Sequence, residues 1–87
     1  MTSYLVEAYL PSSTTLSDVE RRAAQAADDV SGHGLTVRLV RTIYIAEDET
    51  CFLLFDAGSA DAVRQASDRA AIGAQRIVEA VESPVDD

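Results

Sequence analysis

Four polar side chains lie within segments that are rich in apolar residues: Glu7, Tyr9, Arg41 and Glu79. A carboxylate in apolar surroundings can bind a divalent metal ion or, if its pKa is raised, transfer a proton. The two glutamates could instead form ion pairs with Arg41 or with arginines of a second chain at an interface. Ligand or metal binding, catalysis and interface pairing therefore all remain open for these residues.

Two further side chains are weaker candidates for chemistry. His33 is the sole histidine and lies between two glycines; one imidazole cannot build a metal site, although two copies of the chain would supply two. Cys51 is the sole cysteine, which excludes an internal disulfide and a thiolate metal cage within one chain. We expect Cys51 to be a buried strand residue. The weak metal candidates are therefore Glu7, Glu79 and His33.

Length and charge limit the classes of function. The chain has 87 residues, enough for one domain, and a net charge of −8 with no lysine. That balance argues against nucleic acid and anionic membranes as partners, since both require a basic surface. The longest apolar run, residues 51–55, is far shorter than the ~20 residues of a membrane-spanning helix, and no signal peptide is visible. We expect a cytoplasmic protein, and the lysine-free, alanine-rich composition suggests a bacterial origin.

Hydrophobic periodicity and turn residues predict strands at residues 3–10, 36–45, 50–57 and 75–82. They also predict two helices, one beginning at a capping box formed by Ser17 and Glu20, the other capped by Ser59. The order β-α-β-β-α-β predicts an α+β ferredoxin-like fold, with a four-stranded antiparallel sheet and two helices on one face. We expect residues 1–82 to form this single domain and residues 83–87 to form an acidic flexible tail.

The strand at residues 50–57 is apolar on both sides, with Leu53 and Phe55 opposed to Phe52 and Leu54. Two short, alanine-rich helices can cover only one face of the sheet, so the other would expose on the order of 600 Å² of apolar surface. We therefore expect two copies to pack sheet to sheet as a dimeric α/β barrel, with a small ligand or divalent metal ion in the cavity. Leu53 and Phe55 are expected at this pairing surface.

Strand alternation indicates which polar groups face this cavity. In the first strand Leu5, Glu7 and Tyr9 alternate with the apolar residues that face the helices, and the same parity places Arg41 and Glu79 on the open side. The first and last strands are neighbours in this topology, so Glu7 and Glu79 should lie close together. A single β-bulge would reverse the parity.

Residues 4–11, 37–42, 51–57 and 76–79 together resemble a bacterial family of short ferredoxin-like domains of unknown function, some members of which are described as nickel-binding. The resemblance implies a ferredoxin-like fold, a homodimer and glutamates at positions 7 and 79. Metal-competent members are richer in histidine, in the second strand and second helix, where this chain has Arg41 and Ala66. Since imidazole is the usual nitrogen donor for nickel, the resemblance implies a member without the histidine site.

Three functions remain in view. The first is a homodimeric domain that holds a small ligand or a carboxylate-bound metal ion between its sheets. The second is a cofactor-free enzyme of the dimeric α/β-barrel type, similar to monooxygenases and isomerases of this topology. The third is a structural or regulatory interaction module. The enzyme is disfavoured because the sequence offers no set of His with Asp or Tyr for catalysis.

Overall fold

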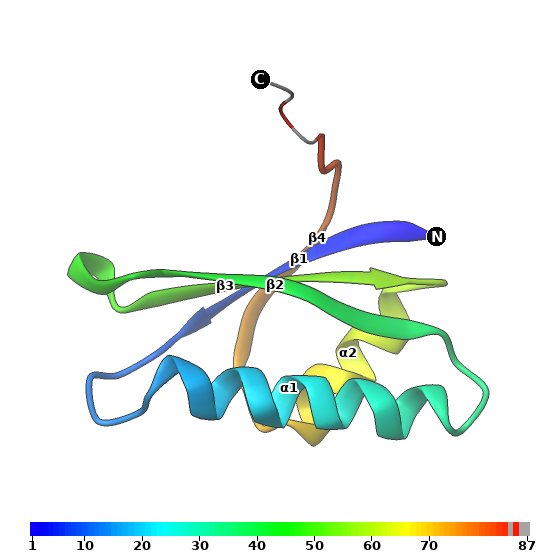
Figure 1. Cartoon of the computed structure of the whole chain (residues 1–87), viewed down its shortest axis with the longest axis horizontal. Coiled ribbons are helices and arrows are strands. Elements are labelled where there is room, and N and C mark those ends of the chain that lie inside the picture. The colour runs from blue at the N-terminus through cyan, green and yellow to red at the C-terminus, as the bar shows by residue number, and fades with distance from the viewer. Residues whose placement is uncertain (84, 86–87) are drawn as a thin grey trace.

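The structure is a computed structural model that describes residues 1–83 and 85. Its elements are β1 (Thr2–Tyr9), α1 (Leu16–Ser31), β2 (Val37–Ile45), the 3-10 helix η1 (Ala46–Asp48), β3 (Thr50–Ala57), α2 (Ala60–Arg69) and β4 (Ala74–Ala80). The strands form one antiparallel sheet in the order β2-β3-β1-β4. Figure 1 shows both helices on the same side of this sheet. The predicted ferredoxin-like α+β fold is therefore confirmed.

Side-chain caps determine where both helices begin. The Ser59 hydroxyl accepts a hydrogen bond from the Ala62 N–H at 3.2 Å and caps α2, as predicted. The capping box predicted at Ser17 is wrong, because the Thr15 hydroxyl accepts from the Asp18 N–H at 3.2 Å instead. Helix α1 therefore starts one residue before Ser17.

The core lies between the helices and one face of the sheet, which we call the covered face. Val6 of β1 and both Leu53 and Phe55 of β3 are 0% exposed on this face. The helices contribute small side chains that let them approach the sheet closely: Val19, Ala23, Ala26, Ala27 and Val30 from α1, and Ala62, Val63 and Ala66 from α2. The expectation that Leu53 and Phe55 form a pairing surface is therefore wrong, because the helices already cover them.

On the opposite side of the sheet, which we call the open face, no helix of the described residues lies. Residues directly opposite each other on antiparallel strands share a face, so the strand register defines four rows across it. From β2 towards β4 these are Arg38–Asp56–Ser3–Ala80, Arg41–Leu54–Leu5–Val78, Ile43–Phe52–Glu7–Arg76 and, without a β4 member, Ile45–Thr50–Tyr9.

A β-bulge in the edge strand β2 sets the direction of its side chains. The register shifts between Leu39 and Arg41, so that Leu39 pairs with Phe55 on the covered face while Arg41 and Ile43 lie on the open face. Simple alternation along the strand would place Leu39, Arg41 and Ile43 on the same face. The bulge moves Leu39 to the covered face and leaves Arg41 on the predicted side.

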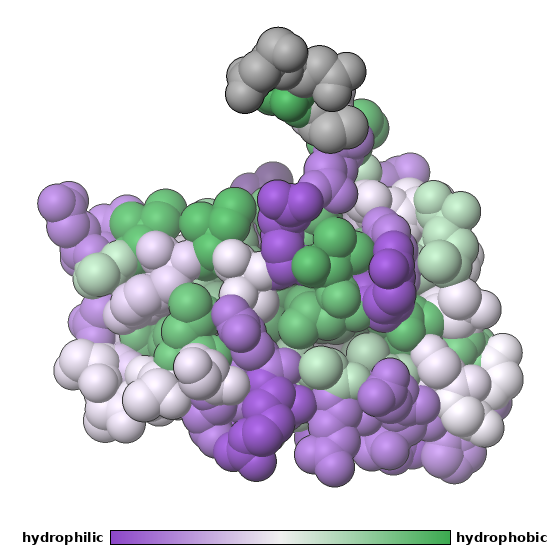
Figure 2. All heavy atoms as spheres, in the orientation of Figure 1, coloured by the Kyte–Doolittle hydropathy of each residue, from purple (hydrophilic) through white to green (hydrophobic). Residues whose placement is uncertain are grey.

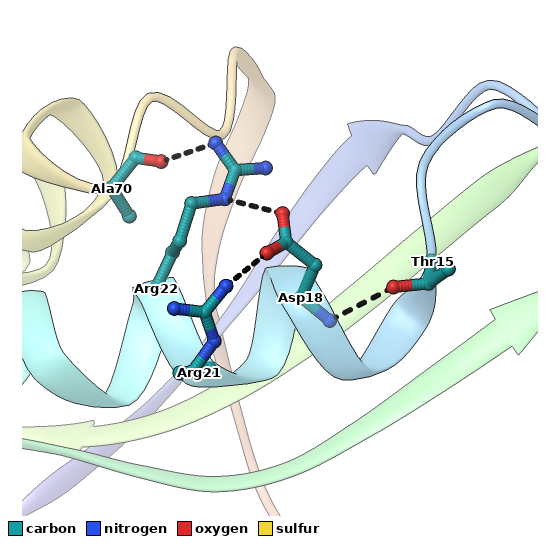
Figure 3. Close-up of polar contacts among 5 residues, drawn as sticks. All are labelled: Thr15, Asp18, Arg21, Arg22 and Ala70. Atoms are coloured by element: carbon teal, nitrogen blue, oxygen red, sulfur yellow. Dashed lines mark hydrogen bonds and ion pairs between the residues drawn. The ribbon is translucent and has the colours of Figure 1, made fainter.

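Arginine contacts join the two helices into one layer (Figure 3). The Arg22 guanidinium of α1 donates to the Ala70 carbonyl at the C-terminal end of α2, at 3.1 Å, and its Nε lies 3.2 Å from Asp18 Oδ2. The neighbouring Arg21 also pairs with Asp18 but is more exposed. Among the described residues, neither helix has the length and hydropathy needed to span a bilayer.

Candidate functional site: the open face of the sheet

The centre of the open face is an apolar band formed by Leu5, Ile43, Phe52, Leu54 and Val78. Its members come from all four strands, and their exposure ranges from 8% for Leu54 to 53% for Ile43. Figure 2 shows hydrophobic atoms along the strand side of the molecule, beside the C-terminal segment. The band is thus an apolar surface that neither helix shields.

Glu7 lies within this band as predicted. It is half-buried between Phe52 on β3 and Arg76 on β4. Within residues 1–83 and 85, the Glu7 carboxylate forms no ion pair shorter than 4 Å, even with Arg76 directly opposite. Sequence reasoning missed Arg76, because Ile77 and Val78 are both apolar and alternation alone cannot tell which of them faces the helices.

Glu79 does not join Glu7. It pairs with Tyr4, and its neighbour two residues earlier, Ile77, pairs with Val6 and packs against the core. Glu79 therefore lies on the helix side of the edge strand β4, where it is exposed. The expectation that Glu7 and Glu79 face the same cavity is therefore wrong for a single chain. Within one chain the two carboxylates do not form a pair.

Tyr9 lies at the end of the open face and is directed towards the β2–β3 connection. Its hydroxyl donates to Glu49 Oε1 at 3.3 Å, and the other oxygen of Glu49 accepts from the Ser12 N–H at 3.1 Å. The Glu49 carboxylate holds the pKa of the Tyr9 phenol above its ordinary value. Tyr9 therefore stays protonated at neutral pH and ties the start of the β1–α1 loop to the hairpin.

Arg41 is on the predicted face, but its partner comes from beyond β4. Its guanidinium lies 2.6 Å from the Glu82 carboxylate. A hollow of about 660 Å³ lies here, lined by part of the apolar band and by the C-terminal segment. Arg41 therefore borders an apolar hollow on the open face.

A polar cluster closes the other end of the open face. Asp56 accepts from the Ser3 hydroxyl at 2.8 Å and from the Arg38 guanidinium at 3.0 Å. The hydrogen bond from Ser3, followed by that from Arg38, holds the pKa of Asp56 below its ordinary value. With both oxygens engaged, Asp56 is a structural carboxylate.

The remaining metal candidate, His33, lies in the exposed turn after α1, where its Nδ1 is 2.7 Å from the Asp29 carbonyl. No group of three or more His, Cys, Asp or Glu side chains that could hold a metal ion is found within the described residues. Cys51 is buried on the covered face, and burial raises the pKa of its thiol. The part of the chain that the structure describes therefore does not bring His33 together with such a set of ligands.

The open face also differs from the rest of the molecule in charge. Its four strands present three arginines, Arg38, Arg41 and Arg76, against two carboxylates, Glu7 and Asp56. The whole chain has a net charge of −8. Glu82 of the C-terminal segment adds a third carboxylate beside Arg41, so the open face is close to neutral on a strongly acidic protein.

Comparison with known proteins agrees with this fold. The structure is similar to the crystal structure of SCO4226 from Streptomyces coelicolor A3(2), with a TM-score of 0.71 and 22% sequence identity over 94% of this chain and 99% of that chain. No curated protein matches the sequence. The family described as "Nickel responsive protein SCO4226-like" matches residues 4–80, nearly the whole domain. The chain therefore belongs to the SCO4226-like family of nickel responsive proteins.

Proposed function

We propose that the protein is a homodimeric binding domain, in which two open faces pack against each other and enclose a cavity for a small ligand or a divalent metal ion. The observation that carries this proposal is the apolar band across all four strands, which neither helix covers. Apolar side chains gain about 25 cal/mol for each Å² removed from water, so a second sheet over this band is strongly favoured. Facing sheets pack about 10 Å apart, which leaves space for a ligand where side chains are small.

Charge supports the same pairing. Two chains of net charge −8 repel each other, and they can approach best through the surface that carries the fewest negative charges. On this molecule that surface includes the open face, where arginines and carboxylates balance.

The rows of residues across the open face indicate which groups would line the cavity. Phe52 and Leu5 would form an apolar floor, while Glu7 and Arg76 would offer an acceptor and a donor beside it. Such a lining suits a small molecule with an apolar body and one or two polar groups. In a symmetric dimer Glu7 is supplied twice, which gives two hard oxygen ligands for a divalent ion.

Nickel is the metal that the family description names, and the residues of this chain do not fit a nickel centre built on histidine. Position 41 carries an arginine, which has no lone pair to donate, and lies on the open face. Ala66 is buried on the covered side of the sheet. The two positions at which the resemblance implies histidines are thus on opposite sides of the sheet, so histidines there could not share one ion within a chain.

Association is tested by placing a charge in the band. Ile43→Asp introduces a carboxylate at an exposed position of the open face, so we expect a folded protein whose dimer is at least tenfold weaker in sedimentation equilibrium. Ala24→Asp adds the same charge to an exposed position of α1 and should leave the dimer intact. Equal association of the two variants would remove the open face as the interface.

Binding is tested with the matched pair Glu7→Gln and Glu79→Gln, which make the same change on opposite sides of the sheet. Calorimetric titration with Mn²⁺ and with Ni²⁺, and native mass spectrometry of the purified dimer for retained small molecules, serve as readouts. We expect Glu7→Gln to lose whatever the wild type binds and Glu79→Gln to retain it. A wild-type dimer that takes up neither ion and retains no molecule would contradict the binding function and leave an interaction module.

A further inference from the structure

The segment after β4 stands on the open face and contacts β2 through an ion pair. Arg41 belongs to β2 and Glu82 follows β4, and these are the two edge strands of the sheet. Adjacent strands are spaced by about 4.8 Å, so the edge strands are about 14 Å apart. The ion pair between Arg41 and Glu82 therefore spans the row that contains Leu54 and Leu5. Leu54 is only 8% exposed, although neither helix lies on that side.

The apolar side chains of this segment are exposed to water in the described part of the chain. Val81 and Val85 are 95% and 89% exposed, the two highest values among the large hydrophobic residues of the described chain. In Figure 1 the segment rises from the sheet on the side opposite the helices. Glu82 thus anchors the segment to the open face, and its two valines border the hollow above the band while they stay largely exposed to water.

The position of this segment conflicts with a simple flat interface. Two sheets that pack face to face are about 10 Å apart, and a peptide segment standing on one of them occupies that space. A second copy can approach only if the segment packs along it or moves away. Two exposed valines on an anchored segment favour packing, because they would lose their contact with water against the apolar band of the second copy.

We propose that the C-terminal segment, represented by Val81, Glu82, Ser83 and Val85, is an arm that holds a second copy of this chain. The two valines pack on the apolar band of that copy, and the Arg41–Glu82 ion pair sets the direction in which the arm leaves its own sheet. By symmetry each copy holds the other. This inference rests on the proposed pairing of open faces and adds the element that each copy extends to its partner.

The experiment compares two double variants of the full chain by sedimentation equilibrium. Val81→Thr with Val85→Thr keeps the side-chain shape and adds hydroxyls that a dry interface cannot satisfy; we expect the dimer dissociation constant to rise at least tenfold. Val81→Ile with Val85→Ile keeps the apolar character, and the dissociation constant should stay within about twofold of the wild type. Both positions are exposed in the single chain, so neither double variant should change the thermal unfolding of dilute protein.

Glu82→Gln tests the anchor separately. Loss of its charge releases the arm from Arg41, and we expect the dissociation constant to rise by less than it does for the double threonine variant. If the threonine variant associates as well as the wild type, or better, the arm is not an interface element and the inference is overturned. In that case Ile43→Asp still decides the pairing of the open faces. A wild-type chain that stays monomeric at high concentration would overturn both.

Discussion

The side chains of β3 point alternately to the two faces of the sheet. Leu53 and Phe55 point to the helices and are fully buried, whereas Phe52, one position along, points to the open face and is half-buried. All three side chains are apolar, so burial and not polarity distinguishes them, while Leu54 on the open face is itself only 8% exposed. The comparison teaches that this sheet has two hydrophobic faces and that the chain itself covers one of them.

The largest expected effect contrasts the two phenylalanines. Phe55→Ala removes a fully buried ring and should lower the free energy of unfolding by about 3–5 kcal/mol in urea denaturation. Phe52→Ala, measured in dilute protein, should cost less than half as much, because that ring keeps contact with water. If Phe55→Ala does not fold, the milder Phe55→Leu, with a loss of up to about 1.5 kcal/mol, replaces it.

Equal losses for Phe55→Ala and Phe52→Ala in dilute protein would show that something else shields the open face within a single chain. The same two variants at high protein concentration sharpen the test. There the cost of Phe52→Ala should grow, since a dimer adds its association free energy to the measured stability.

The next effect concerns the two helices that pack on the covered face. Arg22→Met removes the hydrogen bond to the Ala70 carbonyl and should lower the free energy of unfolding by about 1.5 kcal/mol. Arg21→Met is the matched control: it removes an exposed ion pair with the same Asp18, and its cost should be below about 0.5 kcal/mol. A loss for Arg21→Met as large as that for Arg22→Met would show that the link between α1 and α2 adds nothing.

A smaller effect of opposite sign is expected inside the core. Ser67 of α2 is buried, and its hydroxyl has no hydrogen-bond partner among the described residues. Ser67→Ala removes that unsatisfied group and improves helix propensity, so the free energy of unfolding should rise by about 1 kcal/mol. Ser31→Ala is the control, because that hydroxyl donates to the Val37 carbonyl at 2.8 Å and its loss should destabilise.

If Ser67→Ala and Ser31→Ala both destabilise the protein to the same degree in thermal denaturation, the Ser67 hydroxyl has a partner after all. Changes of opposite sign in unfolding free energy would show that the Ser67 hydroxyl is unsatisfied whereas the Ser31 hydroxyl has a partner.

Much of this architecture could be predicted from the sequence, because periodicity and turn residues are local signals. The bounds of β3 and the Ser59 cap are examples, and so is the position of Glu7 on the open face. The predictions that failed depend on contacts between segments that are distant in the sequence. Glu79 was misplaced because Ile77 and Val78 offer no contrast of polarity, and only the pairing with β1 decides which of them enters the core.

Two other misses have the same origin. Val81 and Glu82 were predicted as the end of the last strand, yet β4 ends at Ala80 and Glu82 reaches Arg41 on the far edge of the sheet. The predicted tail includes residues 84, 86 and 87, which lie outside the part of the chain that the structure describes. A contact between residues about 40 positions apart cannot be recognised from the local hydrophobic pattern of either segment. The covered side of β3 was also assigned wrongly, because both of its sides are apolar and only the helices distinguish them.

The smallest expected effect is a pH dependence at the polar end of the open face. The pKa of Asp56 is lowered in the folded protein, so this carboxylate contributes stability above its ordinary pKa, and the contribution is lost as the pH falls through the lowered value. Ser3→Ala removes the largest cause of the lowering. The loss of unfolding free energy caused by Ser3→Ala should therefore be greatest near neutral pH and shrink in acid, where Ser3 faces a neutral carboxyl group. Urea denaturation of both proteins across that range measures the difference, and a loss that does not change with pH would mean that Ser3 acts on the fold without acting on the Asp56 charge.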